Sequence, residues 1–276
     1  MGNLVRMAVQ IFISIAGLYF VLCLAVLFFQ HYFFFRPEIL AAHFKYQYPF
    51  PFEELNFDME DSGRINAIHF KVPNSRGVIY YLKGNSRSIK GWGKFAKDFV
   101  SNGYDFFMMD YRGFGKSKGK RSQQKLFSDA QFLYQWLRNH YSEEKIIVYG
   151  RSFGSGIAAR VASWNKPRLL MLDSPYISFL YNAQRYAFFL PLKWLLRYDL
   201  RTDQYLKSIS CPVHIIHGTK DMLLSYSQSL KLRALYPDKI ELHSIDGGRH
   251  NNLPDFPEFF ELLYDILYVP PKAKEA

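Results

Sequence analysis

The sequence has only two cysteines, Cys23 and Cys211, among 276 residues, which excludes a disulfide-stapled scaffold. Its 13 prolines and 17 glycines are ordinary for this length and exclude collagen-like and linker-like chains. The sequence also lacks a dinucleotide-binding fingerprint, a metal-ligand spacing and an RNA- or DNA-binding motif. We therefore expect no cofactor, no metal ion and no nucleic-acid partner.

Apolar and aromatic residues are abundant instead. Hydrophobic residues make up 49% of the chain and aromatic residues 18%, which excludes a disordered protein. The length is enough for one large core. Lys and Arg outnumber Asp and Glu by 35 to 24, so the formal charge is +11. Without a nucleic-acid motif, such an excess favours an anionic membrane surface or an acidic substrate.

Residues 7–29 form an apolar run in which Gln10 and Ser14 are the only strongly polar side chains. As a helix, this run would extend about 34 Å, more than the roughly 30 Å hydrocarbon core of a bilayer. It is too long for the apolar part of a signal peptide, and no small-residue cleavage site follows it. The sequence therefore predicts a single-pass membrane anchor. Arg6 and Arg36 flank it on either side, so the basic residues favour neither orientation.

Short apolar runs alternate with longer amphipathic ones after a linker at 36–52. The predicted strands are 54–59, 65–72, 77–82, 105–109, 145–149, 168–172, 212–217 and 239–245. The predicted helices are 122–140, 155–164, 225–235 and 257–267. This alternation is typical of an α/β fold, with a mostly parallel eight-stranded sheet that opens with antiparallel strands and carries helices on both faces. We expect an anchor region at 1–35, one catalytic domain at 53–269 and a disordered tail at 270–276.

A G-x-S-x-G pattern occupies residues 150–154, between a predicted strand and an apolar helix. The turn in this setting is so tight that the residues two positions away from the serine must be small. The hydroxyl of Ser152 would then project above the sheet, where the N-terminus of the helix faces any developing negative charge. Ser152 is the predicted nucleophile. A glycine-rich turn with a solvated serine is the alternative interpretation of the pattern alone.

A serine nucleophile needs a general base and a group that orients it. Asp221 and His250 each follow a predicted strand, and active-site groups of parallel sheets collect at these carboxyl ends. We predict that His250 is the base and that Asp221 orients its imidazole. Asp173 and Asp246 are rival acids, although the first could cap a turn and the second lies beside two glycines.

An oxyanion hole requires two backbone N–H donors. The residue directly after the nucleophile, Phe153, is predicted to supply one of them. The other is expected from the loop that follows strand 77–82, where Asn85 and Ser86 are the candidates.

Five ordered motifs resemble the α/β-hydrolase superfamily: KGN at 83–85, YRGFGKS at 111–117, GRSFG at 150–154, HGTKD at 217–221 and GRHNNL at 248–253. The chain is most similar to its membrane-anchored, bud-emergence-type and serine-aminopeptidase-like branch, over roughly residues 53–268. This resemblance implies a hydrolase that cleaves an ester, thioester or amide through an acyl-enzyme, with Asp221 and His250 completing the triad. One departure is Lys83, because the family usually has His before Gly-Asn. Since the hole uses backbone donors, activity should survive, but Lys83 is expected to alter polarity beside the acyl carbonyl.

The expected function is therefore that of a membrane-tethered serine hydrolase acting on acyl esters or thioesters of a small molecule, a lipid or an acylated protein. A peptidase with the same triad is one alternative, and a catalytically silent binding module is another. The aromatic insertion at 176–210 predicts a helical lid with an acyl pocket beside the bilayer, or else helices packed on the core. The basic stretch 112–125 predicts a solvated loop or a contact with anionic lipid head groups.

Overall fold

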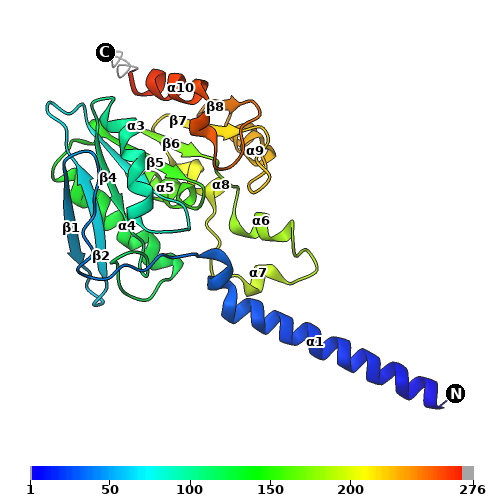
Figure 1. The fold of residues 1–276 in the computed structure, drawn as a ribbon. Coiled ribbons are helices and arrows are strands. Elements are labelled where there is room, and N and C mark those ends of the chain that lie inside the picture. The colour runs from blue at the N-terminus through cyan, green and yellow to red at the C-terminus, as the bar shows by residue number, and fades with distance from the viewer. Residues whose placement is uncertain (1, 269–276) are drawn as a thin grey trace.

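The computed structural model describes residues 2–268, which form an α/β domain with one long helix extending from it (Figure 1). An eight-stranded sheet runs through the domain in the order β1-β2-β4-β3-β5-β6-β7-β8. The strands are β1 (Phe52–Asp58), β2 (Arg64–Phe70), β3 (Val78–Leu82), β4 (Asp105–Met109), β5 (Ile146–Arg151), β6 (Leu169–Asp173), β7 (Val213–Gly218) and β8 (Ile240–Ile245). The pairs β1–β2 and β2–β4 are antiparallel and the others are parallel, so the predicted sheet is confirmed. The tail predicted at 270–276 lies outside the described residues.

Burial explains why the strands are read so clearly from the sequence. Every residue of β3, β4, β5 and β6 is buried, because helices cover both faces of a parallel sheet. Such strands appear in the sequence as continuous apolar runs. The edge strand β1 instead contains exposed residues among half-buried ones, which is typical of a strand with one solvated face.

Helices cover the two faces of the sheet in separate groups. The first core cluster contains residues of α4 (Gln123–Arg138), α5 (Phe153–Trp164) and α9 (Ser227–Leu235). The second contains residues of α2 (Ile89–Trp92), α3 (Ala96–Val100) and α10 (Pro257–Tyr268). Single 3-10 turns occupy Gly93–Phe95, Glu143–Lys145, Leu206–Ser208 and Leu253–Asp255. The short α2 and α3 were not predicted, since neither is long enough to show a helical apolar period.

The N-terminal helix α1 (Gly2–Phe34) is longer than the predicted segment 7–29. Its length and its mean hydropathy of 2.7 over the most apolar window are sufficient to cross a membrane, and that window is 6% buried. The helix continues past the apolar run because its last turns pack on the domain. Gln30 is buried there, and its amide nitrogen donates to the carbonyl of Leu195 at 2.9 Å.

The aromatic insertion after β6 contains three short helices, α6 (Phe179–Gln184), α7 (Leu192–Leu195) and α8 (Thr202–Tyr205). Figure 1 shows α7 beside the part of α1 that is nearest the domain. Four large side chains of the insertion are more than half exposed: Tyr186, Phe188, Phe189 and Trp194. Large apolar side chains exposed close together in the sequence are typical of a ligand-, protein- or membrane-contacting surface.

The basic stretch 112–125 is only partly the expected solvated loop: Lys118 and Lys120 are exposed, but two of its other basic residues are paired within the domain. Arg112 is buried, with Asp129 accepting two hydrogen bonds from its guanidinium and Asp61 accepting a third. Lys116 pairs with Glu54, so it too is neutralised within the domain. The expected contact with lipid head groups is therefore wrong for Arg112, because its charge is used to join the loop after β4 to α4.

We expect removal of this buried pair to destabilise the domain. Arg112 Nε lies 2.7 Å and Nη2 2.8 Å from the carboxylate oxygens of Asp129, and both side chains are 2% exposed. Arg112→Ala leaves Asp129 as an uncompensated buried charge, and Asp129→Ala leaves buried Arg112 with only the partly exposed Asp61. We expect each change to cost about 3–5 kcal/mol in the free energy of unfolding. Thermal unfolding of the full chain in detergent measures the loss. The exposed Lys120→Ala should change it by less than about 0.5 kcal/mol. Equal melting temperatures for all three variants would contradict this assignment.

Candidate active site

Ser152 lies at a strained turn between β5 and α5. Its φ of 52° and ψ of −118° fall in a region that residues other than glycine rarely adopt. The turn is tight because α5 lies directly against the sheet. A Cβ atom on Gly150 would collide with Ala158, and one on Gly154 would collide with the carbonyl of Leu82. Close packing therefore requires both glycines of the G-x-S-x-G pattern.

Three of the predicted site residues form one hydrogen-bonded chain. The hydroxyl of Ser152 lies 2.9 Å from Nε2 of His250, and Nδ1 of the same ring lies 2.7 Å from Oδ2 of Asp221. A carboxylate only accepts hydrogen bonds, so the neutral imidazole carries its hydrogen on Nδ1. Nε2 is then free to accept the serine proton. The three side chains come from the ends of β5, β7 and β8, which lie at the same edge of the sheet.

The two rival acids have other partners. Asp173 is buried and lies 3.3 Å from Nε of Arg151, and the hydroxyl of Tyr149 donates to it at 3.0 Å. Asp246 accepts a hydrogen bond from Thr219 at 2.9 Å in an exposed turn. The carboxylate of Asp173 therefore binds groups at the end of the sheet, and that of Asp246 stabilises a turn.

The loop after β3 borders Ser152. A Cβ atom placed on Gly84 would lie 4.0 Å from Cβ of Ser152 and 2.9 Å from the ring of Trp92. The same indole donates to the carbonyl of Ser86 at 2.7 Å, which fixes the loop in this position. The backbone N–H groups expected to form the oxyanion hole, those of Phe153 and of Asn85 or Ser86, thus belong to two segments that meet at the serine.

Comparisons with known proteins find similarity to hydrolases. Residues 73–198 match a family model described as serine aminopeptidase, S33. The chain is 28% identical to the lysophosphatidylserine lipase ABHD12 of Danio rerio, over 71% of this chain and 59% of that protein. It is 29% identical to the alpha/beta hydrolase domain-containing protein 17C of Homo sapiens, over 71% and 59%. It thus spans about three fifths of the length of these curated relatives.

Solved structures place the fold in the same group. The Pyrococcus furiosus esterase Pf2001 has a TM-score of 0.66 at 22% identity, over 84% of this chain and 98% of that one. An alpha-beta hydrolase from Vibrio vulnificus has a TM-score of 0.66 at 19% identity, over 78% and 80%. At these identities the likeness concerns the fold alone. The chain has the α/β-hydrolase fold.

Asp221 of this α/β hydrolase is held in its charged form. Its Oδ1 accepts the backbone N–H groups of Leu223 and Leu224 at 2.8 and 2.9 Å. Burial alone would raise the pKa of Asp221, but hydrogen bonds from His217 and His250 hold it well below its ordinary value. A carboxylate that stays ionised can orient the imidazole and stabilise it once it is protonated.

His217 is a site residue that the sequence did not single out. Its Nε2 lies 3.2 Å from Oδ2 of Asp221 and 2.8 Å from the carbonyl of Leu224, so two acceptors require the ring hydrogen on Nε2. Its Nδ1 then accepts from the hydroxyl of Ser229 at 2.6 Å. The signal was its place four residues before Asp221 at the end of a strand, but a histidine inside a strand is usually structural.

Lys83, the departure from the pattern of the resembled family, points into the domain. The side chain is fully buried, and Nζ lies 3.3 Å from Asp110 and donates to the carbonyl of Arg87 at 3.2 Å. Burial lowers the pKa of Lys83 to about 8 and raises the pKa of Asp110 to about 6, and each charge opposes the shift of the other. Asp110 also accepts the N–H of Ile89. The expected effect of Lys83 on polarity beside the acyl carbonyl stays a prediction. In the structure, Lys83 ties together the two ends of the loop after β3.

The end of α1 is attached to the same loop. The side-chain amide of Asn85 donates to the carbonyl of Phe34 at 2.6 Å, and its backbone carbonyl accepts the N–H of Arg36 at 3.0 Å. Between these two bonds, the ring of Phe35 is buried with its centroid 5.2 Å from that of Phe153. The expected linker thus begins as a structural part of the candidate site.

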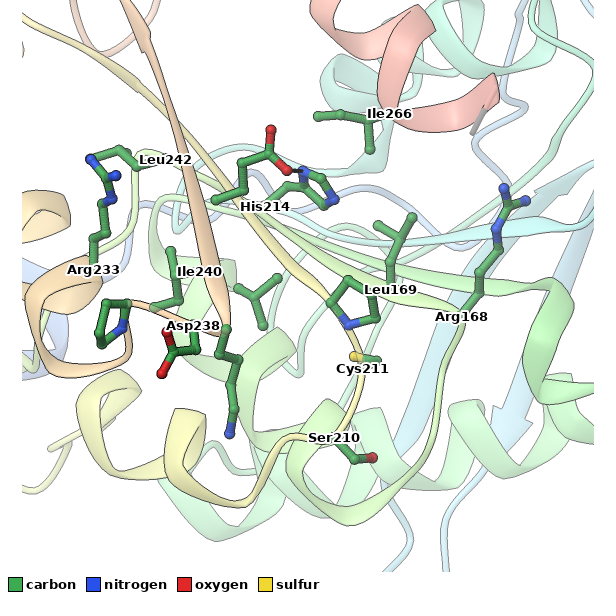
Figure 2. Close-up of a pocket in the computed structure, with 15 residues that line it drawn as sticks. Arg168, Leu169, Ser210, Cys211, His214, Arg233, Asp238, Ile240, Leu242 and Ile266 are labelled. Atoms are coloured by element: carbon green, nitrogen blue, oxygen red, sulfur yellow. Dashed lines mark ion pairs between the residues drawn. The ribbon is translucent and has the colours of Figure 1, made fainter. Parts of the chain in front are cut away.

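A surface pocket of 920 Å³ lies elsewhere, between β7, β8 and α10 (Figure 2). Beside it, nitrogens of His214 and His243 are 3.0 Å apart, and each lies 3.6 Å from an oxygen of Glu241. Such a set could hold a divalent ion, since tetrahedral zinc ligands at about 2.0–2.1 Å from the metal stand at similar separations. Glu241 is 67% exposed, and one hydrogen bond between the rings satisfies the histidines equally well. Among the described residues, those that line this pocket do not include Ser152, Asp221 or His250.

The acid assignment can be tested directly. We expect Asp221→Asn to lower kcat by about 10,000-fold, because the imidazole loses its orienting and stabilising partner. Asp173→Asn should instead lower the melting temperature, since it removes the charge beside buried Arg151, and the folded fraction should turn over normally. Steady-state kinetics and thermal unfolding of both variants separate the two effects. The reverse pattern would reassign the acid to Asp173.

The attachment of α1 predicts that Asn85 positions the oxyanion loop through its side chain. We expect Asn85→Ala to lower kcat by up to about 100-fold, the scale of a small misplacement, because the backbone N–H remains but its loop loses an anchor. Labelling of Ser152 by a fluorophosphonate should persist. Asn102→Ala, which removes a similar amide-to-carbonyl bond at a remote turn, is the matched control. An unchanged kcat in Asn85→Ala would show that the Asn85 side chain does not position the loop.

Proposed function

We propose that this α/β hydrolase is a membrane-anchored serine esterase that cleaves acyl ester bonds of lipids through an acyl-enzyme. The observation that carries the proposal is the continuous hydrogen-bonded chain from Ser152 through His250 to Asp221 at a strained strand–helix turn. A relative named as a lysophosphatidylserine lipase supports an ester as the substrate. The length and hydropathy of α1 support the anchor.

The geometry supports a two-step acyl transfer. Nε2 of His250 takes the proton of Ser152 while Oγ bonds to the acyl carbonyl carbon, and the carbonyl oxygen becomes the oxyanion. The N–H of Phe153 and one N–H of the loop after β3 stabilise that oxyanion. The imidazolium then gives its proton to the leaving alcohol as the C–O bond breaks. Water then adds to the acyl carbon while the same nitrogen takes its proton. The imidazolium returns that proton to Oγ of Ser152 as the acyl–Oγ bond breaks, which releases the acid.

Two other functions remain as alternatives to the lipid esterase. The matched family description favours a serine aminopeptidase, which would use the same three residues on an amide. The apolar surface of α1 and of the insertion favours acyl chains over peptides, because it presents Phe188 and Trp194 in an exposed position beside an apolar helix. A silent binding module would not require an aligned Ser–His–Asp chain.

A fluorophosphonate probe and a substrate series distinguish these functions. We expect the full chain in detergent micelles to be labelled, and Ser152→Ala to be unlabelled and inactive. Ser163→Ala, a serine on the following helix, is the matched control. Turnover should be higher for long-chain monoacyl esters than for aminoacyl amides. Faster cleavage of the amides would favour the peptidase, and a folded wild-type protein that resists labelling would favour the binding module.

A further inference from the structure

A second pocket, of 450 Å³, lies where the end of α1, the start of α4 and the end of the insertion meet. Three basic side chains line it, those of His31, Arg121 and Arg197. Gln30, Ser122 and Gln124 add polar groups. None of the described residues that line this pocket is acidic, so its lining carries a net positive charge.

The pocket lies at the C-terminal end of the apolar run of α1. Gln30 and His31 directly follow the apolar run 7–29, so they reach the head-group layer if α1 spans a bilayer. Gln30 also fixes the wall of the pocket. Its Oε1 accepts the N–H of Arg197 at 2.8 Å, and its Nε2 donates to the carbonyl of Leu195. The guanidinium of Arg197 is thereby kept beside the end of the helix.

The positive charge of Arg121 is not neutralised within the domain. Its Nε donates to the carbonyl of Arg112 at 2.9 Å, but its buried Nη1 has no hydrogen-bond partner among the described residues. The guanidinium lies 4.2 Å from the ring centre of Phe35. Neither Arg121 nor Arg197 forms an ion pair in the part of the chain that the structure describes, whereas Arg112 forms two. An anion in this pocket would therefore meet uncompensated charge.

The start of α4 adds to this potential. Ser122 caps that 16-residue helix by accepting the N–H of Lys125, and the first turn therefore begins at the pocket. The unpaired N–H groups at a helix N-terminus favour an anion. Two arginines and a helix N-terminus together suit a phosphate better than a carboxylate, because a phosphate presents more acceptor oxygens.

An apolar surface extends from the pocket along α1. The hydroxyl of Tyr19 donates to the carbonyl of Phe189 at 2.9 Å. The insertion therefore follows α1 for eleven residues from Gln30 toward the N-terminus, or about 16 Å. Figure 1 shows α7 alongside this part of the helix. Phe188 and Trp194 are 82% and 80% exposed on the insertion. Such a surface accommodates hydrocarbon chains rather than water.

We propose that this pocket binds the phosphate of an anionic bilayer phospholipid, whose acyl chains lie along α1 and the insertion. The proposal rests on the membrane placement of α1 within the proposed function, but not on catalysis at Ser152. A bound lipid would lie close to the catalytic centre, because Arg121 contacts Phe35, and Phe35 packs on Phe153.

The experiment uses the full chain with Ser152→Ala, so that no lipid is hydrolysed. The protein in neutral detergent is titrated with phosphatidylglycerol, with phosphatidylcholine or with inorganic phosphate, and binding is followed by native mass spectrometry and thermal shift. We expect phosphatidylglycerol to bind most tightly. Arg197→Gln should weaken its binding about fivefold, the factor that one basic residue contributes at an anionic surface. Lys193→Gln, an exposed basic residue of the insertion that does not line the pocket, should leave binding unchanged.

Two results would overturn the proposal. Equal affinity of phosphatidylglycerol for Arg197→Gln and for the parent protein would show that the pocket is not its site. Equal stabilisation by inorganic phosphate would show a general anion site rather than a lipid site. Alkaline extraction of membranes separately tests the anchor, and wild-type turnover tests the esterase. Each failure can therefore be distinguished from failure of the lipid site.

Discussion

The close contact between α5 and the sheet is the constraint on which the rest of the site depends. Gly150 and Gly154 allow the helix to approach β3 and β5 without a Cβ atom between them. That approach forces Ser152 to a positive φ and directs its hydroxyl toward the ends of the parallel strands. The loop after β3 then reaches the serine, and the loops after β7 and β8 bring Asp221 and His250 to it.

Buried charge holds the surroundings of that turn. Lys83 of the loop after β3 and Asp110 at the end of β4 neutralise each other, and His217, His250 and two backbone N–H groups keep Asp221 ionised. Such pairs are expensive to break because either partner alone would remain charged without water. These pairs therefore fix the positions of the loops at this edge of the sheet more strictly than apolar packing would.

The end of the apolar helix α1 is continuous with the candidate site. Phe34 and Arg36 are hydrogen-bonded to Asn85, and Gln30 joins α1 to the end of the insertion. The helix, the insertion and the oxyanion loop thus share one set of contacts. This arrangement also accounts for part of the +11 charge. Some basic residues, such as Arg112, are neutralised within the core, while Arg121 and Arg197 gather where α1 meets the domain.

The sequence by itself determined the eight strands, with every end within two residues, and the turn that carries Ser152. These features depend on local patterns, since a buried strand needs an apolar run and a tight elbow needs glycines. The same reasoning placed Asp221 and His250 at strand ends. It did not anticipate α2 and α3, which are too short to show a period, or the full length of α1.

Only the tertiary structure decided which side chains meet. The bond between Asn85 and Phe34 joins residues 51 apart, and that between His250 and Ser152 joins residues 98 apart. Such contacts depend on how loops from different strands converge, and no local sequence pattern predicts that convergence. The same reason explains Arg112: its neighbours in the sequence suggest a solvated basic loop, but the fold brings Asp129 and Asp61 to its guanidinium and buries it.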